Sequence, residues 1–322
     1  MDNASVGSEH DDYACLRMRF FIFAVPLSSK IGSCVPSKKK GLMTMSNDVL
    51  SSLITRIHEE QPLIHNITNT VVTNFTANGL LALGASPVMA YAEEEVADMV
   101  QHARALVLNI GTLTTDLVNT MVTAGKAANK YGVPVLLDPV GAGATPYRTD
   151  AALRILREVE ITLIRGNAGE ISHLIGEGMT VKGVDAGQSE VVERAQMAVR
   201  AARTLGTTVV VSGPEDVITN GDTGLVIKSG HPLLTRVTGT GCLLTSVIGA
   251  FLAVHDSVLE AGAAGLGYYG AAASIAGQKT EQMGTGSFQI AFLDELSNLE
   301  PSVYEKYVEI TDMNELFIKE EA

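Results

Sequence analysis

The stretch Val133-Pro134-Val135-Leu136-Leu137-Asp138-Pro139-Val140-Gly141-Ala142-Gly143 is the strongest indication of the fold class. Its first five residues are apolar on both faces of an extended chain, and Val209-Val210-Val211 repeats that pattern. Strands that are apolar on both faces are typical of a parallel sheet with helices covering both sides. The chain is therefore predicted to be an α/β protein with a mostly parallel central sheet and helices on both faces.

Short apolar runs alternate with helical periodicity on both sides of this stretch. Gly84, Gly132 and Gly206 stand where helices end in a left-handed residue, and Asn220-Gly221 indicates a hairpin turn. The predicted strands are Leu63–Ile67, Pro87–Tyr91, Ala105–Ile110, Val133–Leu137, Ile161–Ile164, Thr207–Val211, Val217–Ile218, Leu225–Lys228 and Leu233–Val237. The predicted helices cover 70–83, 93–103, 114–131, 149–158, 168–175, 189–205, 241–254 and 257–279, after a first helix capped by Ser46. Small residues in the last helix, among them Ala264 and Gly265, should let helices approach closely.

Residues 1–45 differ from the rest of the chain. They mix Ser, Gly and Pro with the run Lys38-Lys39-Lys40 and show no sustained period. We expect a disordered N-terminal extension, with a short targeting or interaction tail as the alternative. Residues 46–322 are predicted to form one domain.

The composition excludes several classes of protein. Hydrophobic residues make up 46% of the 322 residues and charged residues 18%, which excludes an intrinsically disordered chain. A net charge of −13 disfavours a nucleic-acid partner. No apolar stretch reaches the ~20 residues of a membrane span, and the run Phe20–Val25 is short for a signal peptide. Three cysteines are too few for a disulfide framework, so we expect a cytoplasmic protein.

Polar or glycine-rich turns follow four of the predicted strands. In a parallel sheet all strands end at one edge, and ligands bind beyond that edge. These turns are Asp138–Gly143, Arg165–Glu170, Ser212–Pro214 and Thr238–Cys242. Their concentration predicts a ligand site at the carboxyl edge of the sheet.

The turn Thr238-Gly239-Thr240-Gly241 is the sharpest of these features. Glycines let the backbone turn tightly, and the free N–H groups of the following helix favour an anion or the charge of a phosphoryl group in transfer. A plain turn before a helix explains these four residues equally well. No P-loop motif and no dinucleotide fingerprint after the first strand is present.

Single side chains at this edge allow both a functional and a structural interpretation. Asp138 and Glu170 as a pair suit Mg²⁺, although either alone is an ordinary surface acid. Arg165 would neutralise phosphate oxygens or pair with a neighbouring acid. Cys242 at a helix N-terminus is either a small buried apolar residue or a thiol with a lowered pKa.

Five motifs in register resemble the hydroxyethylthiazole kinase family of thiamine salvage. They are His65–Asn69, Pro87–Ala90, Asp138–Gly143, Arg165–Glu170 and Gly239–Cys242, and the resemblance runs from about residue 46 to the end of the last predicted helix. It implies a ribokinase-like fold, and transfer of the γ-phosphate of ATP, with Mg²⁺, to the hydroxyl of 4-methyl-5-(2-hydroxyethyl)thiazole. It also implies a homotrimer with active sites at the subunit interfaces.

The resemblance assigns roles to individual residues. Met89, Gly239 and Asn69 would bind the thiazole alcohol. Arg165 and Ser212 would bind ATP, and Asp138 and Glu170 would hold the metal. The glycine turn itself, and not the resemblance, indicates that the amides of Gly239 and Gly241 would stabilise the transferred group beside Cys242. Many ribokinase-fold relatives carry Asp at the position of Cys242, so the identity of the general base stays open.

Three other functions remain as alternatives to this one. The first is a kinase for another small alcohol, such as a pyrimidine or a sugar. The second is a nucleotide-dependent repair hydro-lyase on the same scaffold, which would use Asp at position 242 and is disfavoured by Cys242. The third is a thiazole- or nucleotide-binding protein without catalytic activity.

Overall fold

A computed structural model describes residues 47–178 and 188–320. All of them belong to one compact unit, residues 42–322. The predicted extension, residues 1–45, lies outside the described residues. Among the helices that are described, none has both the length and the apolar character needed to cross a membrane.

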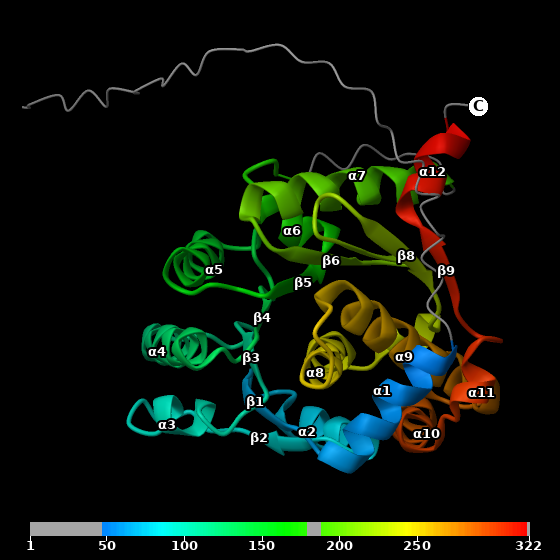
Figure 1. Ribbon diagram of the computed structural model, residues 1–322, viewed down its shortest axis with the longest axis horizontal. Helices are drawn as coiled ribbons and strands as arrows, with labels where there is room; N and C mark the ends of the chain where they lie inside the picture. Colours follow the sequence, from blue (N-terminus) through cyan, green and yellow to red (C-terminus); the bar gives the residue numbers. More distant parts are fainter. Residues whose placement is uncertain (1–46, 179–187, 321–322) are drawn as a thin grey trace, which may run out of the picture. The chain divides into compact units, whose positions relative to one another are not determined.

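The unit is organised around a nine-stranded sheet with the order β2-β1-β3-β4-β5-β6-β7-β8-β9 (Figure 1). The pairs from β2 to β6 are parallel, and the three remaining pairs are antiparallel. The strands are β1 (Leu63–Ile67), β2 (Ser86–Val88), β3 (Ala105–Asn109), β4 (Val135–Asp138), β5 (Leu163–Asn167), β6 (Thr208–Ser212), β7 (Asp216–Thr219), β8 (Gly224–Lys228) and β9 (Glu309–Asp312). The predicted mostly parallel sheet is confirmed.

Helices cover both faces of this sheet. The strands alternate: in β3, Ala105 and Val107 join one buried cluster, and Leu106 and Leu108 join the other. The helices are α1 (Asn47–Glu60), α2 (Thr73–Leu83), α3 (Val96–Val100), α4 (Thr115–Tyr131), α5 (Pro146–Glu158), α6 (Ala168–Leu174), α7 (Gln188–Leu205), α8 (Thr240–Leu252), α9 (Val258–Lys279), α10 (Thr285–Asn298), α11 (Pro301–Tyr304) and α12 (Met313–Glu320). Helices α1, α2, α8, α9 and α10 contribute to the first cluster, whereas α4, α5 and α7 contribute to the second.

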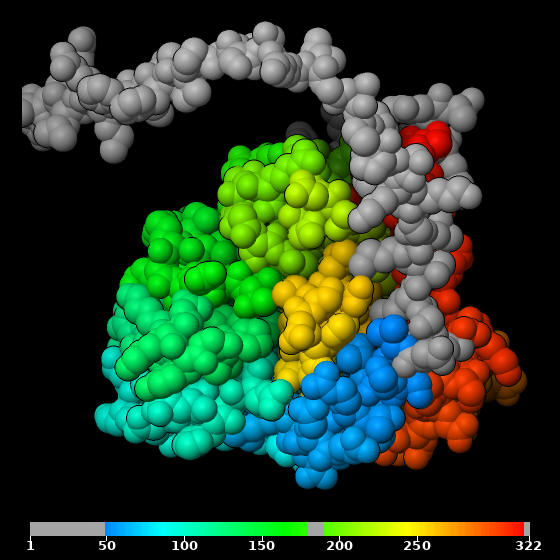
Figure 2. All heavy atoms as spheres, viewed as in Figure 1, coloured from blue at the N-terminus to red at the C-terminus, as the bar shows by residue number. Residues whose placement is uncertain are grey.

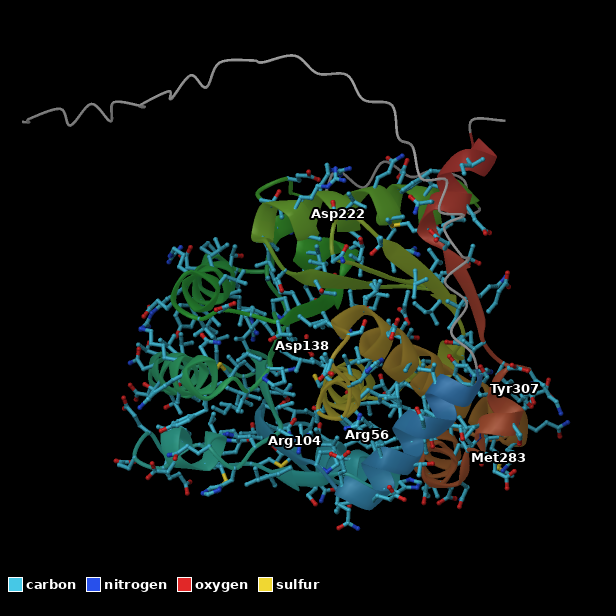
Figure 3. All side chains as sticks on the ribbon, in the orientation of Figure 1. Arg56, Arg104, Asp138, Asp222, Met283 and Tyr307 are labelled. Atoms are coloured by element: carbon cyan, nitrogen blue, oxygen red, sulfur yellow. The ribbon has the colours of Figure 1, made fainter. Side chains whose placement is uncertain are left out.

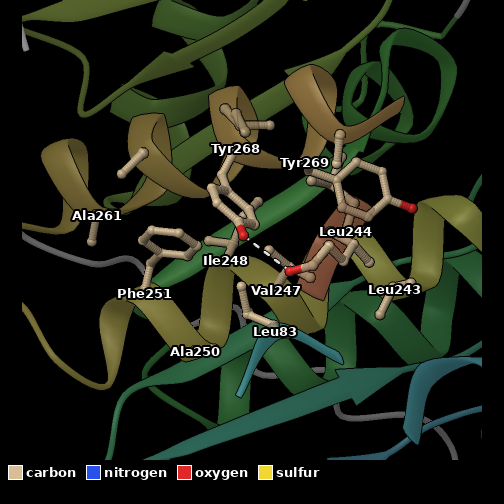
Figure 4. Close-up of a cluster of buried hydrophobic side chains, with 14 of the residues drawn as sticks. Leu83, Leu243, Leu244, Val247, Ile248, Ala250, Phe251, Ala261, Tyr268 and Tyr269 are labelled. Carbon is tan, nitrogen blue, oxygen red and sulfur yellow. Dashed lines mark hydrogen bonds between the residues drawn. The ribbon is translucent and has the colours of Figure 1, made fainter. Parts of the chain in front are cut away.

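Helices α8 and α9 form the centre of the first cluster (Figure 4). A Cβ atom added to Gly265 of α9 would lie 3.1 Å from the Cα of Ile248 in α8, so the small residue permits the close approach. The Tyr268 hydroxyl donates a hydrogen bond to the carbonyl of Leu296, which links α9 to α10. The Tyr269 hydroxyl donates to the carbonyl of Thr240, which holds the start of α8 against α9.

The caps and the hairpin follow the sequence prediction. Gly84, Gly132 and Gly206 all have left-handed φ angles at helix ends, and Gly221 has a φ of 96° in the turn between β7 and β8. Each of these signals is local, because it reflects the backbone geometry that a single residue tolerates.

The predicted strand Leu233–Val237 is wrong. Residues Pro232–Arg236 form a short 3-10 helix, η1, whose first turn accommodates the proline that lacks an N–H group. The edge of β8 pairs instead with β9, a strand that the sequence analysis did not assign. As a result, the turn Thr238–Gly241 follows a helical turn and not a strand.

Candidate active site

The carboxyl ends of the central parallel strands lie side by side. Asp138 is the last residue of β4, and Ser212 is the last residue of β6 and pairs with Asn167 of β5. Strand β8 runs parallel to β6, because two antiparallel pairs separate them, so its last residue, Lys228, lies at the same edge. In the space-filling view, gold atoms of the α8–α9 region reach the surface between α1 (blue) and the green central segments (Figure 2).

Asp138 lies buried in the middle of the unit, between the strands and α8 (Figure 3). Its Oδ2 accepts hydrogen bonds from Asn109 Nδ2 (2.9 Å) and from the Thr245 hydroxyl (3.0 Å). Its Oδ1 is buried and has no partner among the described residues. Burial raises the pKa of this carboxyl group to about 7, although the positive charge of Arg165 acts in the opposite direction.

Arg165 connects three of the predicted site residues. Its Nη2 donates to the Ser212 hydroxyl at 2.8 Å, and its Nη1 is 4.0 Å from Asp138 Oδ2. A Cβ atom on Gly241 would lie only 2.9 Å from the same Nη1. Position 241 thus leaves room for the guanidinium group to lie against the first turn of α8.

Gly239 shapes the entry into α8. Its φ angle is 91°, and a Cβ atom there would approach Cγ1 of Val72 to 2.8 Å. A larger residue would therefore be strained in its backbone and would collide with the start of α2. The N–H groups of the first turn of α8 have no side-chain cap at the N-cap position, which leaves them free for a bound anion.

The fold brings Cys242 into contact with Asn69, which lies 173 residues earlier in the chain. Asn69 Nδ2 lies 3.4 Å from Cys242 Sγ and donates to Asn109 Oδ1 at 3.0 Å, so both residues join the network around Asp138. Burial, followed by the charge of Asp138, raises the pKa of the Cys242 thiol to about 11. The alternative of a thiol with a lowered pKa is therefore wrong, because desolvation outweighs the effect of the helix N-terminus.

Glu170 uses both carboxylate oxygens in contacts with the backbone. Its Oε1 accepts from the N–H of Gly141, and its Oε2 accepts from the N–H of Asn167, each at 2.9 Å. Together with the Asn167 side chain this forms a capping box at the start of α6. Glu170 therefore also joins the loop after β4 to the end of β5.

Met89 lies away from Asp138. The sheet order places β2 three positions from β4, a separation of about 14 Å at the usual strand spacing. The structure ends β2 at Val88, so Met89 follows the strand and is half-buried. The buried His65 imidazole donates from Nε2 to the carbonyl of Ala90 at 2.9 Å and so holds this segment against β1.

A cavity of about 620 Å³ lies beside Arg165, within the range of small-molecule sites. Arg165, Ser212 and Gly241 form part of its lining, whereas Asp138, Glu170, Cys242, Gly239 and Met89 do not. Its other walls come from the turn after β6, the segment Ser229–Thr235 and the face of α9 that carries Leu266 and Tyr269.

Asp216 is a cavity residue that the sequence analysis missed. It opens β7, and its Oδ1 accepts a hydrogen bond from the N–H of Gly213 at 3.0 Å. Burial raises the pKa of its carboxyl group to about 6. The available signal was the turn Ser212–Asp216, which joins the parallel part of the sheet to its antiparallel part.

The side chains at the site offer few ligands for a metal ion. Among residues 47–178 and 188–320, no three His, Cys, Asp or Glu side chains form a cluster that could hold a metal. The unpartnered Oδ1 of Asp138 is nevertheless a suitable oxygen ligand, and Mg²⁺ in nucleotide sites needs only one or two carboxylates. The residues present fit Mg²⁺ bound mainly by phosphate and water.

The fold and this site together define a small-molecule kinase of the ribokinase-like class. Residues 54–302 match the model of the hydroxyethylthiazole kinase family. The chain belongs to the hydroxyethylthiazole kinase family, which confirms the predicted family, fold and enzyme class.

Solved structures agree with this assignment. A hydroxyethylthiazole kinase protein from Pyrococcus horikoshii OT3 is 42% identical, with a TM-score of 0.75, over 82% of this chain and 99% of that one. The Staphylococcus aureus pyridoxal kinase in complex with ADP is 14% identical, with a TM-score of 0.55, over 78% of this chain and 98% of that one. An ADP/ATP-dependent NAD(P)H-hydrate dehydratase from Bacillus subtilis is 17% identical, with a TM-score of 0.53, over 83% of this chain and 99% of that one. The last two show the fold alone.

Proposed function

We propose that this protein transfers the γ-phosphate of ATP to the hydroxyl group of 4-methyl-5-(2-hydroxyethyl)thiazole. The observation that carries the proposal is the position of Arg165, which joins Ser212 to the first turn of α8 beside the buried Asp138. A cation and free helix N–H groups directed at one point stabilise the charge of a phosphoryl group in transfer.

The triphosphate would lie in the cavity with its terminal group between Arg165 and the start of α8. Arg165 and Ser212 bind phosphate oxygens, and the amides of Gly239 and Gly241 donate to the transferred group. Because the transition state is loose, alignment and charge stabilisation supply most of the catalysis. The buried surroundings strengthen each of these interactions by excluding water.

Asp138 and Glu170 are the proposed side chains for Mg²⁺. Asp138 would offer its unpartnered Oδ1, and Glu170 the remaining lone pairs of oxygens that already accept backbone bonds. When bound, Mg²⁺ neutralises negative charge on the phosphates. Asn109 and Thr245 keep the Asp138 carboxyl group in one orientation.

The thiazole alcohol would bind at the opposite side of the α8 N-terminus, near Asn69, Gly239 and Met89. Asn69 already contacts Cys242, so its amide group is held at the start of α8. Cys242 stays a neutral thiol at pH 7 and is a weak acceptor for the proton of the alcohol. Met89 follows β2, which pairs with β1, the strand that precedes Asn69, so both residues would lie on the same side of the alcohol.

In a homotrimer with interface active sites, a neighbouring subunit would add further contacts to the alcohol. Helices α2 and α10 pack against each other, and large apolar side chains on these helices or just before them are exposed. These are Val71 (68% exposed), Leu81 (60%), Met283 (61%) and Ile290 (66%). We refer to these four residues as the α2–α10 patch and propose it as the subunit interface. Because ATP is the phosphate donor, the cytoplasm is the proposed compartment.

The deciding experiment measures ATP consumption with and without the thiazole alcohol, and with a panel of pyrimidine and sugar alcohols. We expect stimulation by the thiazole alcohol and formation of its phosphate. Absence of stimulation by thiazole, with stimulation by another alcohol, would contradict the proposed acceptor.

The Arg165→Ala variant tests whether Arg165 stabilises the phosphoryl group in transfer. Loss of the guanidinium group should lower kcat/KM at least 100-fold, since it removes a charge-stabilising group from the transition state. Arg56→Ala is the matched control, because Arg56 is an exposed residue of α1 that pairs with Glu60. Arg165→Ala with wild-type kcat/KM would rule out this role.

A further inference from the structure

A second cavity of about 470 Å³ adjoins the one that holds Arg165. The two cavities share Pro214, Ser229 and Gly230 in their linings. Helix α9 borders both: Leu266, Tyr269 and Gly270 line the larger cavity, and Ser274 lines the smaller one. At 1.5 Å per residue, these positions extend along about 12 Å of one helix face. The two cavities therefore lie next to each other along α9, and we refer to them together as the α9 cleft.

The far end of this cleft is built by the segment Glu305–Glu309, which connects α11 to β9. Glu309 pairs with Lys228 at the carboxyl end of β8, so the segment meets the same edge of the sheet as Ser212. Four strand spacings separate β9 from β5, the strand that carries Arg165, which is a distance of about 19 Å. Residues 303–320 lie beyond the residues matched by the family model, which ends at 302.

The side chains at this end suit a planar polar ring. Tyr307 lines the smaller cavity next to α11, and its hydroxyl lies 3.0 Å from Gln278 Oε1, which fixes the ring (Figure 3). Lys228 and Lys306 offer donors there, and Glu305 and Glu309 offer acceptors. Aromatic side chains stack on nucleobases regardless of the base, and polar groups at the base edge add selectivity.

Ser229, which both cavities share, has a buried hydroxyl group without a hydrogen-bond partner among the described residues. In this rotamer its Oγ lies against the backbone of Gly270, in the space that a side chain there would fill. Unpaired buried hydroxyl groups are costly, so rotation of the Ser229 side chain into the cavity would let the hydroxyl pair with a ligand. A ribose lies between the phosphates and the base and carries hydroxyl groups suited to this contact.

We infer that the segment Glu305–Glu309 forms the base-binding end of the nucleotide site, with Tyr307 against the ring and Ser229 at the ribose. This inference rests on the proposed function, because the cation Arg165 places the phosphates at the other end of the cleft. The segment then governs affinity for the nucleoside part of ATP and leaves the phosphate contacts unchanged.

The test compares two ligands by calorimetry in the absence of thiazole alcohol: a non-hydrolysable ATP analogue and inorganic tripolyphosphate, which has no base. Tyr307→Ala should weaken the ATP analogue roughly tenfold and leave the Kd of tripolyphosphate within about twofold. Tyr307→Phe keeps the ring and should stay near wild type. Tyr131→Ala, at an exposed tyrosine at the end of α4, is the matched control.

Two results would overturn the inference. One is an unchanged affinity of Tyr307→Ala for the ATP analogue, and the other is an equal loss for both ligands, which indicates a structural effect. Photolabelling of the wild-type protein with 8-azido-ATP gives a second measurement that needs no variant: the label should appear within 305–309, and a label confined to other segments contradicts the inference. Wild-type protein that binds neither ligand would instead contradict the proposed function.

Discussion

Asp138 is the most constrained polar side chain of the site. It is fully buried, holds two hydrogen bonds on one oxygen and leaves the other oxygen free. A buried carboxylate without full pairing is costly in its charged form, which is why the pKa is raised to about 7. The unfavourable burial of this charge occurs at a position where the unpartnered Oδ1 can bind a cation.

The raised pKa predicts a pH-dependent stability. Because the folded-state pKa of about 7 exceeds the ordinary value of 3.8, the protonated form contributes stability below about pH 4 that is lost as the pH rises through 7. Asp138→Asn cannot ionise and should lose about 2 kcal/mol less unfolding free energy than wild type between pH 5.5 and pH 8. Urea denaturation at both pH values measures this difference.

Asp222→Asn is the control for that comparison, because its side chain is 89% exposed. Between the two pH values, the unfolding free energy of Asp222→Asn should change by the same amount as that of the wild type. Equal pH dependence in wild type and Asp138→Asn would show that the Asp138 pKa is not raised.

Cys242 allows a test of proton removal. A thiol with a pKa of about 11 accepts the alcohol proton poorly at pH 7, whereas a carboxylate at the same position accepts it well. If proton removal limits the rate, Cys242→Asp should raise kcat about tenfold, and Cys242→Ser should not. Steady-state kinetics with saturating ATP measures the effect. Unchanged or lower kcat in Cys242→Asp, with intact ATP binding, speaks against a limiting proton transfer.

Side chains at the ends of the strands link the elements that form the site. Glu170 links the loop after β4 to the end of β5, and Arg165 links β5 to β6 and to α8. Short elements depend on such caps because their own backbone bonds are few. The same residues therefore serve the fold and the site.

The two roles of Glu170 can be separated by a pair of variants. Asn167→Ala removes the side-chain cap of α6, and Glu170→Gln leaves a single side-chain oxygen for the two backbone N–H groups that Glu170 accepts, so each should lower the free energy of unfolding by about 1 kcal/mol. Only Glu170→Gln removes a proposed metal-binding carboxylate, so only this variant should need more Mg²⁺ for half-maximal activity. Denaturation curves and Mg²⁺ titrations of the rate measure both effects. A similar Mg²⁺ requirement in the two variants would leave Glu170 with a capping role alone.

The α2–α10 patch concerns the whole molecule. Leu81 and Ile290 lie on two helices that pack together, and Val71 and Met283 lie just before those helices. Exposed apolar side chains that gather in this way mark interaction surfaces, and Val71 precedes Val72, the residue at the start of α2 that Gly239 approaches. An interface there would lie next to the proposed alcohol site.

Disruption of this patch should change the oligomeric state. Ile290→Asp places a charge in the proposed interface and should convert trimers into monomers with lower activity. Ile318→Asp in α12 is the matched control, since Ile318 is equally exposed at 67% and lies outside the patch. Light scattering after size-exclusion chromatography measures the mass. Wild-type monomers, or trimers of Ile290→Asp, would refute the proposed interface.

Local signals in the chain were sufficient for most of the fold. Apolar runs such as Val209–Val211 predicted buried strands, and glycines such as Gly132 predicted helix ends, because each signal depends on a few neighbouring residues. The strand β9 escaped notice because Glu309–Asp312 is short and mostly polar. The segment Leu233–Val237 has the apolar content of a strand but pairs with no strand in the described part of the chain.

The partners of the site residues were beyond the reach of such signals. Thr245 lies 107 residues from Asp138, and Cys242 lies 173 residues from Asn69, so packing of the whole unit creates these contacts. Charge and pKa at the site follow from that packing, since burial raised the pKa of both Asp138 and Cys242. Residue types along the chain thus set the elements and the candidate chemistry. Desolvation and long-range hydrogen bonds, which exist only after folding, set the state in which each group acts.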